Sequence, residues 1–83
     1  MDKPLDLTVF SSEKVLFEGK VNSITSNNDK GKFDVIPEHS NFISLINGKL
    51  TIRPVGQAEV NIPLSSGVLR VIDGRIEVFV GVG

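Results

Sequence analysis

The sequence predicts an all-β fold, a flattened β-sandwich or barrel of about nine to ten short strands. Apolar residues alternate with polar ones at a period of two along most of the chain. Pairs that favour tight turns, Asn47-Gly48 and Asp73-Gly74, separate some of these runs. No stretch of ten residues has helical periodicity. Because 83 residues leave room for one core, we expect a single domain over residues 1–83.

The first predicted strand runs from Leu5 to Val9, where apolar and polar side chains alternate, and Ser11-Ser12 interrupts it. Two short, bent strands are predicted on either side of Gly19, from Val15 to Glu18 and from Val21 to Thr25. Apolar residues that break the alternation in this region indicate either a bulge near the glycine or strands covered on both faces.

The polar stretch from Ser26 to Lys32 predicts an exposed loop, since its Asn, Asp and Gly residues favour turns. Further strands are expected around Phe33 to Val35, ended by Ile36-Pro37, and over Phe42 to Ile46. Asn47-Gly48 then predicts a two-residue hairpin, because both central positions of a type I′ turn require positive φ.

The C-terminal half predicts a strand from Leu50 to Arg53, a turn over Pro54 to Gln57 and a strand from Val60 to Leu64. Gly67 separates this strand from the next apolar run. A second hairpin at Asp73-Gly74 leads into the last strand.

Composition excludes several classes of protein. Hydrophobic residues make up 40% of the chain and charged residues 23%, so we expect it to fold. Nine basic against ten acidic residues give a net charge of −1, without the basic patch of a nucleic-acid-binding protein. The absence of cysteine excludes disulfides and thiolate metal sites. No apolar run approaches the roughly 18 residues of a membrane span, so any membrane association is expected to come through a partner.

The candidates for chemistry are few, and we expect no catalytic residue, cofactor or metal. His39 is the only histidine, and with Glu38 it invites an acid–base hypothesis, but a turn between strands explains it better. No G-x-S-x-G elbow surrounds any serine, and Gly31 to Phe33 lacks the spacing of a phosphate-binding loop. These residues favour a small all-β interaction domain.

The segment Gly31 to Leu45 resembles the most recognisable part of the epsilon subunit of bacterial and chloroplast F-type ATP synthases. In that family a glycine-rich run leads through a proline and a histidine into an apolar strand. The other matching segments, in order, are Leu7 to Val9, Val15 to Val21, Asn47 to Ile52, Ser65 to Val71 and Arg75 to Val80. The match covers nearly the whole chain.

The resemblance implies a ten-stranded β-sandwich at the foot of a central stalk. Such a subunit joins the gamma subunit to the membrane c ring in proton- or sodium-driven ATP synthesis, bound peripherally at the cytoplasmic face of the bacterial membrane. Carried over by position, Ser11, His39 and Ser44 lie at the gamma-facing side, and Gly31 and Lys32 face the c ring.

The chain departs from the family's pattern. Lys32 replaces a usual acidic residue, and Asp34, Glu38 and Asn41 replace glycine, glycine and proline. We expect a compensating change on the partner of Lys32. The family's C-terminal helical domain has no counterpart here, either because this is a short member or because that domain was cut away, so the resemblance implies neither inhibition nor ATP binding.

Two other hypotheses are kept beside this one. An unrelated β-sandwich that binds a peptide or carbohydrate predicts an exposed aromatic platform, against which the absence of Trp and Tyr argues. An enzyme built around His39 and Glu38 predicts a concave pocket at that turn.

Overall fold

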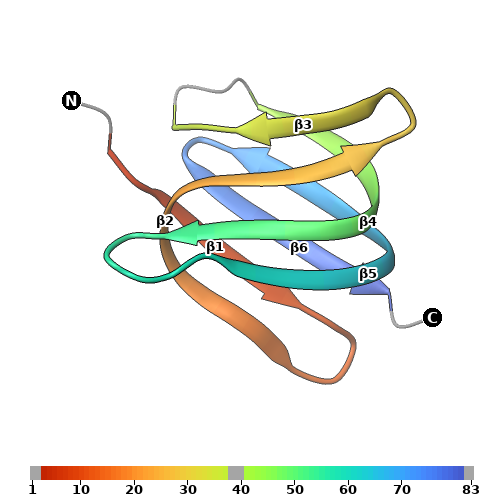
Figure 1. Ribbon diagram of the computed structural model, residues 1–83, viewed down its shortest axis with the longest axis horizontal. Coiled ribbons are helices and arrows are strands. Elements are labelled where there is room, and N and C mark those ends of the chain that lie inside the picture. The colour runs from red at the N-terminus through yellow and green to blue at the C-terminus, as the bar shows by residue number, and fades with distance from the viewer. Residues whose placement is uncertain (1–2, 38–40, 82–83) are drawn as a thin grey trace.

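The computed structural model describes residues 3–37 and 41–81, and these form an all-β structure without a helix (Figure 1). This confirms the predicted fold class. The strands are β1 (Leu5–Phe10), β2 (Val15–Asn28), β3 (Gly31–Val35), β4 (Phe42–Pro54), β5 (Val60–Ile72) and β6 (Arg75–Gly81).

Five of the strands close into a flattened ring. Neighbours pair in the order β1, β6, β5, β4, β2, and β2 returns to pair with β1. The β1–β6 pair is parallel and the other pairs are antiparallel. β3 extends the sheet beyond β2 at the edge of the molecule (Figure 1). Ring closure leaves few free strand edges, which favours a rigid body.

The prediction of nine to ten strands is wrong for the described part of the chain, which contains six. β2, β4 and β5 are 13 or 14 residues long and pass through residues that predicted breaks. β5 continues through Gly67. Likewise, the expected loop from Ser26 to Lys32 shortens to a turn at Asp29-Lys30, because β2 runs to Asn28 and β3 begins at Gly31.

The hairpin predicted at Asn47-Gly48 is also wrong, since both residues lie inside β4. Gly48 has φ +83°, in the positive region that a type I′ turn would also require, but it lies in an irregular stretch of a continuous strand. Opposite β2, β4 advances from Asn47 to Thr51 while β2 advances only from Asn27 to Thr25. A residue with positive φ suits a bulge as well as a turn, and pairing on both sides keeps the strand intact.

The hairpin at Asp73-Gly74 is confirmed. Asp73 has φ 49° and Gly74 φ 81°, as a type I′ turn requires, and Ile72 pairs with Arg75 across it. The structure also resolves the irregularity near Gly19, which itself pairs regularly with Leu7.

Two bulges in β2 explain why apolar side chains in this region depart from simple alternation. Opposite β1, β2 advances from Val15 to Phe17 while β1 moves by one residue, leaving Leu16 as an extra residue. Opposite β4, Asn22 is extra in the same way. Because each bulge shifts the phase of the strand, Ile24 returns to the interior although it lies out of step with Val21.

The core fills the interior of the ring. Its buried residues come from all six strands and are Leu5, Leu7, Val9, Val21, Ile24, Val35, Ile46, Leu50, Ile52, Leu64, Leu69, Val71, Ile76, Val78 and Val80. A buried hydroxyl, Ser26 Oγ, donates to the carbonyl of Lys49 at 2.9 Å. The bulged part of β4 is thereby tied to β2.

We predict that Gly67→Ala destabilises the protein by about 1–3 kcal/mol, because the added methyl has no room. A Cβ at Gly67 would lie 2.8 Å from the carbonyl oxygen of Phe79 and 3.3 Å from Ile46 Cγ1. Urea unfolding measures the loss. Gly19→Ala is the control, since its Cβ would meet only the Phe17 ring at 3.8 Å. Equal stability of the two variants would contradict this packing.

Candidate functional site

A row of apolar side chains, three exposed and one half-buried, crosses four strands on the outside of the ring. It consists of Leu45 on β4, Val68 on β5, Phe79 on β6 and Phe10 on β1, hereafter the apolar row. Leu45 pairs with Val68, Val68 with Phe79, and Phe79 with Phe10, so the four side chains share one face. Leu45 is 74% exposed, and Val68 and Phe79 are 40% exposed. Contiguous exposed apolar side chains mark interaction surfaces.

The apolar row has fixed geometry and a polar rim. The Phe10 and Phe79 rings meet edge to face with centroids 5.4 Å apart. On one side, Arg70 Nε donates to Glu77 Oε1 at 3.0 Å across β5 and β6. On the other side lies the exposed Ser66 of β5, opposite Gly81 of β6.

Two shallow hollows lie along the apolar row. One, of about 250 Å³, lies between Phe10 and the Arg70–Glu77 pair; the other, of about 240 Å³, lies beside Leu45 and Gly67. An apolar centre with a polar border is the usual anatomy of a protein interface.

The residues predicted to face gamma lie beside the apolar row rather than in it. Ser11 follows Phe10 and builds the β1–β2 turn, where its Oγ accepts from Lys14 N at 3.3 Å. Ser44 precedes Leu45, and its half-buried Oγ accepts from Asn28 Nδ2 at 3.3 Å. His39 lies outside the described residues. The two serines are thus chain neighbours of the end residues of the apolar row, but the Ser44 side chain lies on the face of β4 opposite to that of Leu45.

The residues predicted to face the c ring begin β3. Gly31 has φ +118° and pairs with Asn28, and Lys32 pairs with Asn27. Both are exposed. They lie next to the β2–β3 turn, and in the sheet order β2 and β4 separate β3 from β5 (Figure 1).

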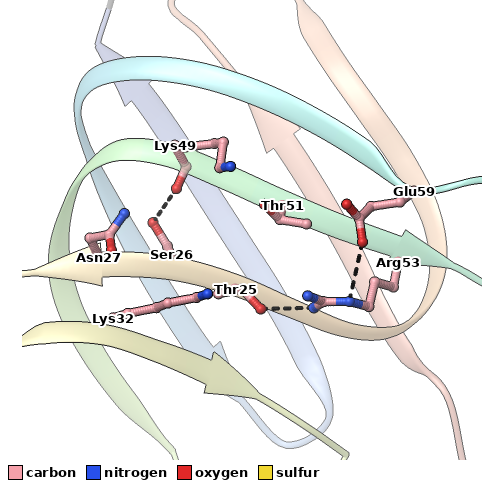
Figure 2. A pocket seen from close by; sticks show the side chains of 8 residues that line it. All are labelled: Thr25, Ser26, Asn27, Lys32, Lys49, Thr51, Arg53 and Glu59. Carbon is pink, nitrogen blue, oxygen red and sulfur yellow. Dashed lines mark hydrogen bonds and ion pairs between the residues drawn. The ribbon is translucent and has the colours of Figure 1, made fainter.

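Lys32 also lines a polar groove on the outside of β2, β3 and β4, hereafter the polar groove (Figure 2). Its volume is about 370 Å³, and its lining residues are Thr25, Ser26, Asn27, Lys32, Lys49, Thr51, Arg53 and Glu59.

A hydrogen-bonded cluster closes one end of the polar groove. Arg53 Nη1 donates to Thr25 Oγ1 at 2.7 Å and to Ser23 Oγ at 3.2 Å, and Arg53 Nε lies 3.5 Å from Glu59 Oε1. Thr25 Oγ1 in turn donates to Asp34. Asp34 thus has a structural role here.

Asn41, like Asp34, departs from the family's pattern and has a structural role. Its Nδ2 donates to Asp73 Oδ1 at 3.2 Å, and its Oδ1 accepts from Asp73 N at 2.9 Å. These bonds hold the start of β4 against the β5–β6 turn. The side chain therefore stabilises the described fold at a position where proline could not donate.

The hypothesis of an enzyme at His39 and Glu38 concerns residues outside those described. Within residues 3–37 and 41–81, no group of three or more His, Cys, Asp and Glu side chains is placed to hold a metal ion. Nor do these ranges contain a helix long and apolar enough to cross a bilayer.

Reasoning from the sequence missed the apolar row, although it leaves a signal. The runs Phe42-Ile43-Ser44-Leu45-Ile46 and Val78-Phe79-Val80 place apolar side chains on both faces of a strand. One face fills the core, so the other requires a second apolar environment.

Comparison with known proteins identifies relatives of this chain by sequence. The chain is 31% identical over 75 residues to the ATP synthase epsilon chain of Leptospira borgpetersenii serovar Hardjo-bovis, covering 89% of this chain and 58% of that protein. It is 36% identical over 74 residues to that of Clostridium novyi, covering 86% and 55%. The chain spans about half the length of the curated relatives it matches.

Solved structures share the fold. A chain of the Euglena gracilis mitochondrial ATP synthase, in a structure of OSCP, F1 and c-ring, matches with a TM-score of 0.85 at 20% identity, covering 93% of this chain and 50% of that one. A chain from the central stalk and c-ring of the Tetrahymena thermophila enzyme matches with a TM-score of 0.80 at 17% identity, covering 95% and 64%. Residues 4–82 match the family described as ATP synthase, Delta/Epsilon chain, beta-sandwich domain, and the chain belongs to that family.

Proposed function

We propose that this protein is the central-stalk epsilon subunit of a rotary ATP synthase, coupling the gamma subunit to the membrane c ring. It acts in ATP synthesis driven by protons or sodium ions and carries no catalytic residue of its own. As part of the F1 sector it lies peripherally at the cytoplasmic face of the bacterial membrane and reaches the membrane only through the complex.

The apolar row is the observation that carries the proposal. A family member with an exposed Leu45–Val68–Phe79 surface requires a partner to cover it, because those side chains lose contact with water only in a complex. We assign the gamma subunit to this surface. Ser11 and Ser44, the gamma-facing positions expected from the family, are the chain neighbours of Phe10 and Leu45 at its two ends.

The closed ring explains how such a subunit transmits torque. Both predicted contact regions are built on paired strands, with the apolar row on β4, β5, β6 and β1 and the c-ring-facing residues on β3. β4 contributes its first half to the apolar row and its second half to the polar groove. A load applied at one region therefore reaches the other through hydrogen-bonded strands rather than through a loop.

The hypothesis of an unrelated β-sandwich binding module is not favoured, since residues 4–82 match the family. It predicts an exposed aromatic platform, but among the described residues only Phe79 is an exposed aromatic side chain, and it lies within the apolar row.

Calorimetric titration with the gamma subunit of the same organism tests the proposal. We expect submicromolar binding, and at least about a tenfold loss in Val68→Arg, since the long cation would project from the middle of the apolar row. Gln57→Arg, in the exposed β4–β5 turn, is the control and should bind as the wild type does. Thermal melting of each variant reports folding. A well-folded chain that does not bind gamma would refute the proposed function.

A further inference from the structure

The polar groove contains two lysines whose side chains bind no other described residue. Within residues 3–37 and 41–81, neither Lys32 nor Lys49 forms an ion pair or a side-chain hydrogen bond. Their side chains approach from β3 and β4 on either side of β2 (Figure 2). We call this part, with Ser26 and Asn27 between the lysines, the lysine end of the polar groove.

Arg53, the other cationic residue that lines the groove, already has partners within the fold. Arg53 pairs with Glu59 and donates to two hydroxyls, so its charge and its donors serve the fold. Asp34 is tied to this same end through Thr25. The lysine end therefore keeps two uncompensated positive charges in a chain whose net charge is −1.

The register brings these two charges within reach of one anion. Lys32 pairs with Asn27, and Asn27 pairs with Asn47, two residues before Lys49. Adjacent strands are about 4.8 Å apart, so the two backbones are about 10–12 Å apart and both side chains reach a group above β2. A carboxylate has the charge and size for such a position.

The lining favours a carboxylate on a protein loop over a nucleotide. None of the lining residues is aromatic, so no ring is available to stack on a base. The lining is polar and charged, which suits a charged side chain at the tip of a loop. Lys32 also lies beside the β2–β3 turn, the region that the proposed function directs towards the c ring.

We propose that the lysine end of the polar groove binds an acidic side chain of the polar loop of the c ring, held between Lys32 and Lys49. This inference rests on the proposed function and gives its second contact a definite chemistry. It implies that the c-subunit loop of the same organism contains an Asp or Glu.

The test is binding of the chain to the detergent-solubilised c ring of the same organism, measured by surface plasmon resonance. We expect Lys32→Glu/Lys49→Glu to bind at least about tenfold more weakly at low salt, since two attractions become two repulsions. The wild-type affinity should fall with ionic strength. Lys3→Glu/Lys14→Glu makes the same charge change outside the groove and is the matched control. Replacing the acidic residue of the ring loop by lysine should restore binding of the double variant.

Three outcomes overturn the inference. The first is equal ring binding by the two double variants, and the second is a c-subunit loop without an acidic residue. The third is a Lys32→Glu/Lys49→Glu variant that binds the ring as the wild type does but no longer binds phosphatidylglycerol-containing vesicles. The last result would assign the lysines to lipid headgroups. Gamma titration separates this inference from the proposed function. If the chain binds gamma and the ring, and the substitutions at Lys32 and Lys49 do not change its affinity for the ring, the proposed function stands and the lysine contact is refuted. If it binds neither partner, both the function and the contact are refuted.

Discussion

Leu45→Glu should weaken binding to the gamma subunit by at least about 30-fold, the largest effect on binding that we expect from a single exposed residue. At the centre of a protein interface, loss of an apolar contact costs about 2 kcal/mol or more, and a buried unpaired carboxylate adds to that cost. Leu45 is 74% exposed in the free chain, so the substitution should leave the fold intact. Calorimetry with gamma measures the loss, and thermal melting checks folding.

Val55→Glu is the matched control for this experiment. Val55 is also an exposed apolar residue, at 44%, but it lies in the β4–β5 turn outside the apolar row. It should bind gamma with wild-type affinity. If Val55→Glu weakens binding as much as Leu45→Glu does, the apolar row is not the gamma contact.

Leu69→Ala should have the largest effect on stability, lowering the free energy of unfolding by about 2–5 kcal/mol. Leu69 is fully buried in the middle of β5, between Ser44 on β4 and Val78 on β6. A chain of 83 residues has a total stability of only about 4–12 kcal/mol, so this loss is a large share of it. Urea unfolding followed by circular dichroism measures the difference.

The same substitution at the surface provides the comparison. Leu16 is a bulge residue of β2 that is 39% exposed, and Leu16→Ala should cost less than about 1 kcal/mol. A greater loss at Leu16 than at Leu69 would mean that the core is not inside the ring described here.

Local pattern was enough to predict the strands with a simple alternation. Leu5 to Val9 and Ile76 to Val80 point alternate side chains into the core, and Asp73-Gly74 turns the chain between β5 and β6. Asn47-Gly48 has the same local chemistry but lies within β4. The difference is tertiary, because β4 has β2 and β5 on its two sides at that point. A single sequence contains no signal for that pairing.

The candidate site was less predictable for a related reason. In a strand, adjacent residues point to opposite faces, so Ser44 and Leu45 occupy different environments although they are neighbours in the chain. Only the pairing of Leu45 with Val68, and of Val68 with Phe79, shows that these side chains form one surface. Lys32 was noted in the sequence because it departs from the family's pattern. Its proximity to Lys49 depends on how β3 and β4 each pair with β2, which the sequence does not show. The gamma and c-ring positions remain predictions.

The central claim, that the apolar row binds the gamma subunit, is tested most directly by nuclear magnetic resonance of the ¹⁵N-labelled chain titrated with unlabelled gamma. We predict that amide signals of Leu45, Val68, Phe79 and their neighbours on β4, β5, β6 and β1 shift or broaden, while those of Lys32 and the rest of β3 stay unchanged. Changes confined to β3, with the apolar row unaffected, would contradict the account.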